Sequence, residues 1–478
     1  MPKQLLKILK NGLLPLLLGC GLFFINIRDS HDWGDDFAQY LLEARNIKQG
    51  IPLDSSGYIQ NPDFLLIGPK AYPPGFPLLL TVSSSIFQDE IVGGQFLISF
   101  FLLMLGWLFF LLLRKFKTPY LLSLVLMVSL LYHPWMLEQK SQVLSDIPFA
   151  CFILLTCLLA DPKKGLWYYA LAGFTAGIAI SIRSIGWVIP IAGIVVMLYY
   201  SFANKTFDKK HGLLTAVAAL TAIGINTLAG YNGFSGGYSS SIGSETSFIE
   251  TTINHLQLYF NELQSFIEIE VNHWHGLMLF LQLLMWAGLI LGLTKFKKYP
   301  FLITFLFGYL ALIVIFPFTG GFRFLLPVVP LIIMVANTCF PKFVKFQSAV
   351  TIFLLLILNI AYQPHRQYII AKQNELVDGP QMPEAQQLFN FINTSLTKED
   401  VVVFSKPRAL GYYTHVKTAA TLWEIDQNEF IRQTEKLGVT HYLAYTDMEY
   451  FALNDFVLAN HQSLEILYRN EKFTLYSK

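Results

Sequence analysis

The sequence is dominated by apolar runs long enough to cross a lipid bilayer as helices. A transmembrane helix needs about 20 consecutive apolar residues, within a range of about 17–25. Runs of this kind recur over the first three quarters of the 478-residue chain. They occupy residues 5–27, 92–113, 119–137, 142–160, 166–182, 184–202, 212–230, 274–294, 299–317, 321–340 and 346–362. They predict a polytopic α-helical membrane protein with about 11 transmembrane helices.

The composition supports this fold class and excludes several others. Hydrophobic residues make up 54% of the chain and charged residues only 14%, whereas soluble domains are about one quarter charged. The net charge of +2 provides no basic surface for DNA or RNA, so we expect no nucleic-acid partner. The four cysteines all lie in apolar stretches, which excludes a disulfide framework and a zinc site built on cysteines.

Lysine and arginine residues alternate between the turns and set the expected orientation. With the N-terminus in the cytoplasm, every second turn carries a basic cluster, as cytoplasmic loops do. The clusters are Lys3/Lys7/Lys10, Arg114/Lys115/Lys117, Lys163/Lys164, Lys205/Lys209/Lys210, Lys295/Lys297/Lys298 and Lys342/Lys345. The first run exceeds the apolar core of a signal peptide, so we expect it to be retained as a helix. An odd number of spans then places the C-terminus outside the cytoplasmic (inner) membrane.

Three polar regions are expected on the outer side: the loops 28–91 and 231–273, and the tail from 363. The tail alternates strand and helix patterns, which predicts a small extracytoplasmic α/β domain. Its expected elements are helices after Pro383 and over 424–437, and strands over 401–404, 440–444, 464–468 and 473–476. We therefore predict a transmembrane domain over 1–362, including both loops, and a second domain over 363–478.

The first loop contains an unusual cluster of carboxylates. Asp32, Asp35 and Asp36 fall within five positions, just before an amphipathic pattern over 37–49 that suits a helix on the outer membrane surface. Asp35 or Asp36 can simply cap this helix, because carboxylates are favoured at helix N-termini. The same residues can also carry out proton transfer, and the sequence leaves both roles open.

Three further motifs lie on the same predicted side of the membrane. The Tyr72-Pro73-Pro74-Gly75 turn is consistent with a plain membrane-entry turn, and Asp146 with a helix cap. Arg183 falls between two apolar runs, which marks either a functional residue or a side chain that extends to the interface. Arg323 lies at the outer start of another run. A carboxylate and two fixed cations at one membrane face suit a proton acceptor and a lipid phosphate.

Together these motifs resemble the GT-C superfamily of integral-membrane glycosyltransferases. The likeness is greatest to the bacterial family 39 type, which is related to protein O-mannosyltransferases and to the lipid A aminoarabinose transferase. It covers roughly residues 1–365. It rests on the acidic pair followed by Tyr40 and Ala44, the Tyr72-Pro73-Pro74-Gly75 turn, Ser145-Asp146-Ile147-Pro148-Phe149, the Arg183 segment and Arg323-Phe324-Leu325-Leu326-Pro327.

The resemblance implies a reaction and its participants. Such enzymes transfer a sugar from a polyprenyl-phosphate-linked donor at the outer leaflet to an acceptor, with inversion at the anomeric carbon. The implied partners are membrane lipids, the lipid-linked donor and a glycan, lipid or protein acceptor. We expect no cofactor and no metal, because Asp35 and Asp36 are adjacent and no D-x-D pattern accompanies them.

The resemblance also assigns roles to individual residues. Asp35 takes the place of the general base, and Asp36 stands where the family usually has glutamate. Tyr72 stands where the family often has a lysine that contacts the donor phosphate, and Lys70 is the nearest substitute. We expect Arg183 and Arg323, with Lys70, to bind the donor phosphate. Tyr72, Asp146 and Tyr40 are expected to be substrate-binding or structural residues.

Other functions remain compatible with the sequence. A lipid or glycolipid transporter (a flippase) explains the many spans and an intramembrane arginine, but not the acidic cluster or the α/β tail. A non-catalytic envelope-assembly scaffold with the same fold is a second alternative, and a polysaccharide polymerase or ligase is a third. Asp35 separates the scaffold from an enzyme, because a scaffold tolerates asparagine at this position.

Overall fold

A computed structural model describes residues 12–25, 28, 30–231, 248–267, 275–295, 299–338, 347–372, 375–448 and 450–478. Contacts divide the chain into two compact units. The first comprises residues 1–27, 95–228 and 245–374, and the second comprises 28–94, 229–244 and 375–478. The first exterior loop thus packs with the tail. The predicted domain boundary near 362 stays a prediction.

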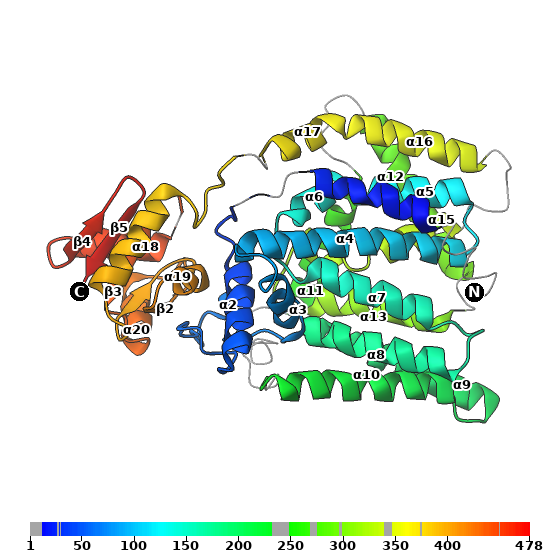
Figure 1. Ribbon diagram of the computed structural model, residues 1–478, viewed down its shortest axis with the longest axis horizontal. Helices are drawn as coiled ribbons and strands as arrows, with labels where there is room; N and C mark the ends of the chain where they lie inside the picture. Colours follow the sequence, from blue (N-terminus) through cyan, green and yellow to red (C-terminus); the bar gives the residue numbers. More distant parts are fainter. Residues whose placement is uncertain are drawn as a thin grey trace. The chain divides into compact units, whose positions relative to one another are not determined.

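The first unit is helical, as expected (Figure 1). Its helices are η1 (Cys20–Phe24), α4 (Glu90–Lys115), α5 (Tyr120–Leu131), α6 (Pro134–Lys140), α7 (Asp146–Leu159), α8 (Leu166–Ile182), η3 (Ser184–Trp187), α9 (Val188–Asn204), α10 (Lys209–Leu228), α11 (Phe248–Ser265), α12 (His275–Lys295), α13 (Pro300–Ile315), α14 (Phe322–Leu325), α15 (Val329–Thr338), α16 (Gln347–Ala361) and α17 (Gln363–Lys372).

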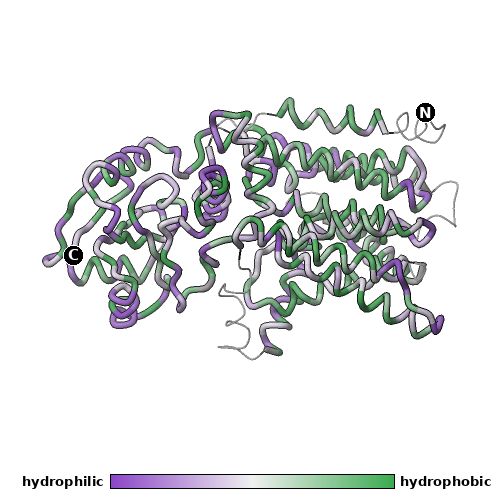
Figure 2. The backbone as a smooth tube through the Cα atoms, turned by 60° about the horizontal axis from the view of Figure 1, so that its bottom comes forward, coloured by the Kyte–Doolittle hydropathy of each residue, from purple (hydrophilic) through white to green (hydrophobic). Residues whose placement is uncertain are grey.

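Three described helices are long and apolar enough to cross a membrane, namely Glu90–Lys115, Ser184–Asn204 and Lys209–Leu228. The bent pair α5–α6 makes a fourth if it counts as one span. Shorter apolar helices occupy other predicted runs, among them Gly12–Phe24, Asp146–Leu159, Leu166–Ile182, Pro300–Ile315 and Thr351–Ala361. Figure 2 shows these helices as mainly hydrophobic, with hydrophilic residues gathered at the turns. Every predicted run contains a helix, while the number of spans stays a prediction.

Local sequence explains the breaks in this unit and a close contact between two of its helices. Pro134 begins α6 after a bend of 54° from α5, because its ring cannot continue the preceding helix. Arg183 is extended between α8 and η3, as its position between two apolar runs suggested. The helices α8 and α10 pack through Gly173 and Gly177, where an added Cβ would lie 2.6 Å and 2.4 Å from atoms of α10. This small-residue spacing lets two membrane helices approach closely.

The second exterior loop contributes to the first unit. Its residues 233–247, where the sequence is rich in glycine and serine, lie outside the described residues. The next segment forms α11, which packs against α13 and α14. The loop therefore provides a helix beside α14, which carries Arg323.

The second unit combines the described helices of the first loop with an α/β tail. Its elements are α2 (Asp35–Gln49), η2 (Leu65–Ile67), α3 (Gly75–Ser83), α18 (Pro383–Ser395), β1 (Val401–Val403), α19 (Pro407–Tyr413), β2 (Lys417–Ala419), α20 (Gln427–Lys436), β3 (His441–Tyr445), α21 (Phe451–Asn460), β4 (Glu465–Arg469) and β5 (Phe473–Ser477). The predicted α/β tail is confirmed, although the sequence did not predict α19, β2 or α21.

The tail is built on one sheet of five strands in the order β2-β1-β3-β5-β4. Strand β1 runs parallel to both β2 and β3, while β5 runs antiparallel to β3 and β4. Helix α20 begins at its cap Asp426, whose side chain accepts the Glu429 N–H, and is followed by Gly438 with a φ of 68°. The first loop extends this sheet, because Tyr58 forms a parallel bridge with Thr418 of β2.

Trp33 anchors the first loop to the tail inside this unit. Its ring lies 5.6–6.4 Å from the ring centroids of Phe389, Phe404, Tyr445 and Phe473, and its indole N–H donates to Asp378 at 3.2 Å. Aromatic packing of this kind buries a large apolar area. The tail core thus packs around Trp33, which lies two positions before the acidic pair.

Helix α2 differs from the helix that the sequence predicted. The predicted helix over 37–49 is present, but it begins at Asp35 and packs against α3 and α19. Its buried residues include the polar side chains of Gln39, Glu43 and Asn46. Polar groups at these depths need protein partners, so α2 is a core helix of the second unit and not a helix with one face free for lipid.

Candidate active site

The acidic pair occupies the first turn of α2. Gly34 precedes this turn and has no side chain with which to cap it. Asp35 instead reaches another helix, since the backbone N–H groups of Arg408 and Ala409 donate to its Oδ1 atom at 3.0 and 3.1 Å. These groups belong to the first turn of α19, which begins at Pro407. Asp35 therefore caps a helix, but that helix is α19 and not the helix over 37–49 that the sequence offered.

Arg408 links the acidic pair to the turn around Tyr72. Its side chain is fully buried, and one guanidinium N–H donates to the Tyr72 hydroxyl at 2.8 Å while another donates to the Pro69 carbonyl at 2.6 Å. The Tyr72 hydroxyl in turn donates to Asp36 Oδ1 at 2.7 Å. Arg408 also lies 3.4 Å from Asp36 Oδ1. The arginine, the phenol and the carboxylate thus form one continuous polar chain.

The two carboxylates differ in their surroundings. The Asp35 side chain is 11% exposed and that of Asp36 is 29% exposed. Asp35 Oδ2 lies 3.9 Å from Arg408 Nε, and neither atom makes a hydrogen bond within the described residues. Burial raises the pKa of Asp35 to about 6, while the Arg408 charge and the Ala409 N–H limit the rise. A carboxylate with a pKa near 6 suits general-base chemistry at neutral pH.

The other predicted residues of the first loop fall into two groups. Tyr40 is buried, and its ring lies 4.9 Å from the rings of both Tyr72 and Phe76. The Tyr40 ring therefore packs against the ring of Tyr72. Lys70 has an exposed side chain, whose ammonium makes no hydrogen bond or ion pair with the described residues. Only the Lys70 backbone carbonyl is engaged, by the Gln39 amide at 2.6 Å.

Glu43 lies further along α2 and holds the Tyr72 turn by a hydrogen bond. Its Oε1 atom accepts the Tyr72 backbone N–H at 2.7 Å and the Gln39 side-chain amide at 2.8 Å, while its Oε2 atom is buried without a partner among the described residues. Burial raises the pKa of Glu43 to about 8, although both hydrogen bonds oppose the rise. Burial therefore favours the protonated form of this carboxyl group at neutral pH.

This burial predicts a pH-dependent stability effect for Glu43→Gln. When folding raises the pKa of a carboxyl group, the free energy of unfolding of the protein falls with rising pH. For Glu43 the fall runs from the usual pKa near 4.5 to the folded-state pKa of about 8. The uncharged glutamine avoids this loss. We expect the variant to match the wild type near pH 5 and to exceed it at pH 9, by on the order of 4 kcal/mol. Thermal unfolding at both pH values tests this, with the exposed Glu435→Gln as control. Equal stabilities at pH 9 would contradict it.

A second charged cluster lies in the first unit, at the start of α7. Asp146 is only 1% exposed and pairs with two arginines, one at each carboxylate oxygen. Arg183 contacts Oδ1, and Arg323 lies 3.3 Å from Oδ2. The Arg323 side chain is 32% exposed and that of Arg183 is 18% exposed. These three side chains carry a formal charge of +1 between them, and both arginines are partly exposed.

The structure therefore groups the sequence-predicted residues into two sets. Asp35, Asp36, Tyr72 and Tyr40 come together in the second unit. Asp146, Arg183 and Arg323 come together in the first unit. The sequence patterns did not single out Arg408. Pro407 marks a helix start, but a lone arginine one residue later carries no signal of burial.

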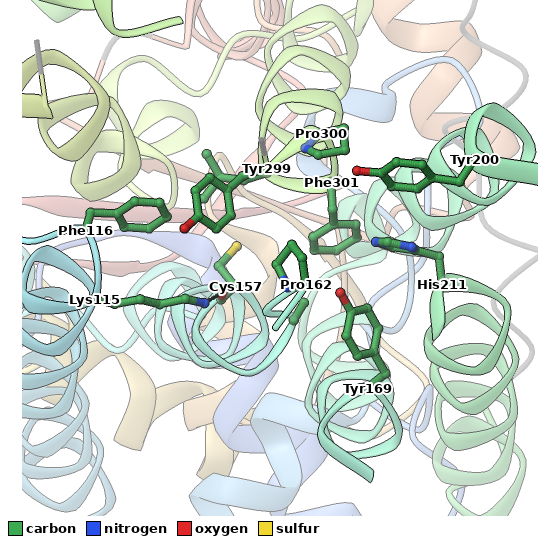
Figure 3. Close-up of a pocket in the computed structure, with 12 residues that line it drawn as sticks. Lys115, Phe116, Cys157, Pro162, Tyr169, Tyr200, His211, Tyr299, Pro300 and Phe301 are labelled. Atoms are coloured by element: carbon green, nitrogen blue, oxygen red, sulfur yellow. Dashed lines mark hydrogen bonds between the residues drawn. The ribbon is translucent and has the colours of Figure 1, made fainter. Parts of the chain in front are cut away.

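A small pocket in the first unit lies at the opposite end of α7 from Asp146 (Figure 3). It has about 350 Å³ of empty space, including solvent at its mouth. Its lining includes Lys115, Cys157, Tyr169, His211 and Tyr299. It adjoins the C-terminal end of α7, whereas Asp146 begins that helix. Within the described ranges, no three His, Cys, Asp or Glu side chains gather as a metal site. The prediction that no metal or cofactor is needed stays untested.

Comparison with known proteins identifies the fold. Residues 71–226 match the family model described as dolichyl-phosphate-mannose-protein mannosyltransferase. No curated protein matches the sequence. Among solved structures, ArnT from Cupriavidus metallidurans bound to undecaprenyl phosphate is 12% identical, with a TM-score of 0.58 and 97% of each chain covered. The fold is that of the GT-C membrane glycosyltransferases.

Archaeal members share this GT-C fold. An oligosaccharyltransferase from Archaeoglobus fulgidus, solved with zinc and sulfate, is 14% identical at a TM-score of 0.58, covering 98% of this chain and 73% of that one. AglB from the same organism, with an inhibitory peptide and a dolichol-phosphate, is 14% identical at 0.55, covering 96% and 72%. The predicted resemblance is thus confirmed at the level of the fold, and the chain is a membrane protein.

Proposed function

We propose that the protein is a glycosyltransferase that uses a polyprenyl-phosphate-linked sugar as donor. The observation that carries this proposal is the GT-C fold over nearly the whole chain. ArnT of this fold is described with undecaprenyl phosphate, and AglB with a dolichol-phosphate. In this proposal the N-terminus is cytoplasmic and the transfer takes place at the outer face of the cytoplasmic membrane, following the placement of basic residues.

The proposed reaction inverts the anomeric carbon. An acceptor hydroxyl attacks that carbon, the carbon–oxygen bond to phosphate breaks, and polyprenyl phosphate leaves with the bonding electrons. Asp35 takes the proton of the acceptor hydroxyl. Its raised pKa and its hydrogen-bonded Oδ1 atom support this role, because a base needs a fixed position and a pKa near the working pH.

The arginine cluster suits the leaving group. Polyprenyl phosphate carries about two negative charges at neutral pH. Arg183 and Arg323 supply two positive charges, and Asp146 pairs with both arginines. Fixed cations that face the charge developing on the leaving group stabilise the transition state. Lys70 is a further candidate for the phosphate, since its ammonium has no partner among the described residues.

Release of the lipid carrier tests the proposal. Purified protein in detergent is incubated with a panel of polyprenyl-phosphate sugars, and free polyprenyl phosphate is followed by mass spectrometry. We expect release from at least one donor by the wild type and by Asp54→Asn, an exposed carboxylate of the same loop, but not by Asp35→Asn. Transfer of a glycolipid across vesicle membranes without cleavage of any donor would overturn the proposal in favour of a transporter.

A further inference from the structure

Arg408 is the largest side chain that the described part of the protein buries completely. A buried guanidinium is costly unless charged and hydrogen-bonded groups surround it. Here it comes from the C-terminal tail, 372 residues along the chain from Asp36. Its burial therefore joins the tail to the acidic pair of the first loop inside one compact unit.

The contacts of Arg408 converge on the acidic pair. Its guanidinium lies 3.4 Å from Asp36 Oδ1 and 3.9 Å from Asp35 Oδ2. Its own backbone N–H donates to Asp35 Oδ1. The planar group also lies over the rings of Tyr58 and Tyr72, at 5.3 and 4.8 Å from their centroids. The rings and the Pro69 carbonyl thus hold the cation where it meets both carboxylates.

We propose that Arg408 is a positioning residue of the transfer reaction, which keeps both carboxylates of the acidic pair ionised and orients Asp36 through the Tyr72 hydroxyl. This inference rests on the proposed function. It makes the C-terminal tail part of the reaction machinery, because the tail supplies the one cation that touches both acids among the described residues.

The physical argument is charge balance. Two adjacent carboxylates repel each other, and burial disfavours their charged forms, so without a nearby cation one of them takes up a proton. A protonated Asp35 cannot accept the acceptor's proton. The other titratable or charged groups facing this cluster are Lys406, Tyr58, Tyr72 and Glu43. Lys406 adds a second positive charge near Asp35. Among the described residues, however, it forms no hydrogen bond or ion pair with either carboxylate.

The pH profile of the reaction tests this role. In Arg408→Gln we expect the acidic limb of kcat/KM to move to higher pH by about 1–3 units, the range by which a neighbouring opposite charge shifts a carboxyl pKa. Arg408→Lys retains a charge but not the planar fork, so we expect a smaller shift and a lower plateau. Arg432→Gln removes an exposed arginine of the same tail and is expected to leave the profile unchanged. An Arg408→Gln profile that superimposes on the wild type would overturn the inference.

Unfolding measurements test the same coupling without any donor. Arg408→Gln removes the cation that contacts both carboxylates of the acidic pair. We therefore expect the triple variant Asp35→Asn/Asp36→Asn/Arg408→Gln to unfold at a higher temperature than Arg408→Gln alone. A triple variant that is equally or less stable would contradict the inference. If the wild type cleaves no donor, the proposed function fails, and this comparison still decides whether Arg408 keeps the pair ionised.

Discussion

Asp35→Asn is expected to lower the rate of sugar transfer by about 10²–10⁴-fold, the usual contribution of a positioned general base. Asparagine keeps an oxygen at the Oδ1 position, so the Arg408 and Ala409 N–H groups retain their acceptor. The substitution removes the ability to take a proton while preserving the cap of α19. We therefore expect a folded, monodisperse protein that has lost turnover and not donor binding.

The pH dependence of the wild type supplies a second check on this prediction. With a pKa near 6, Asp35 is protonated below that pH and cannot act as a base. The rate should therefore fall as pH decreases through about 6, and it should be flat above it. Full activity at pH 5 would contradict the assignment. Equal turnover by wild type and Asp35→Asn in a folded protein would remove Asp35 from the chemistry altogether.

Asp36→Asn provides the informative comparison within the pair. It leaves the Asp35 contacts with α19 intact. An asparagine oxygen at this position can still accept the hydrogen bond of the Tyr72 hydroxyl. We expect a smaller loss of turnover than for Asp35→Asn. A larger loss would instead assign the proton transfer to Asp36, whose side chain is the more exposed of the two.

Asp146→Asn is expected to lower the free energy of unfolding by about 3–5 kcal/mol. Asp146 is almost completely buried and pairs with Arg183 and Arg323, so its neutralisation removes the carboxylate charge from both ion pairs. Thermal or denaturant unfolding in detergent measures the loss. The matched control is Glu399→Gln, which breaks a pair with Lys417 on the surface, where the Glu399 side chain is 86% exposed. Exposed pairs contribute about 0–1 kcal/mol.

A double variant separates charge balance from packing at this position. Removing one arginine as well, in Asp146→Asn/Arg183→Gln, leaves one arginine charge in the cluster where Asp146→Asn leaves two. We expect this protein to be more stable than Asp146→Asn alone. Additive losses from the two substitutions would show that Asp146 and Arg183 are not energetically coupled. The donor KM should rise in the double variant, since one of the two proposed phosphate ligands is lost.

Local patterns were enough to predict the fold class. Apolar runs of the right length predicted the helical unit, because a bilayer-spanning segment must satisfy its backbone hydrogen bonds within itself. Alternating strand and helix signals predicted the α/β tail, including β1, β3, β4, β5 and the helix closed by Gly438. The short elements α19 and β2 were missed, because seven and three residues are too few to show a period.

The sequence predicted only part of the candidate site. The sequence singled out Asp35, Asp36, Asp146, Arg183 and Arg323 because charge is conspicuous beside apolar runs. It did not predict which helix Asp35 caps or that one carboxylate, Asp146, holds both arginines. Residues 37 and 177 positions apart in sequence share that ion cluster. Such pairings depend on how distant segments pack, and no local period records them.

The sequence by itself determined that this chain enters a membrane, carries an α/β tail and places an acidic pair before a helix. Each of these properties follows from hydrophobicity and charge over a few neighbouring residues. Only the tertiary structure decided that the first loop and the tail form one unit, that Arg408 is buried against the acidic pair, and that the pKa of Asp35 rises to about 6. Burial and ion pairing are long-range properties, because they arise when segments hundreds of residues apart exclude water together.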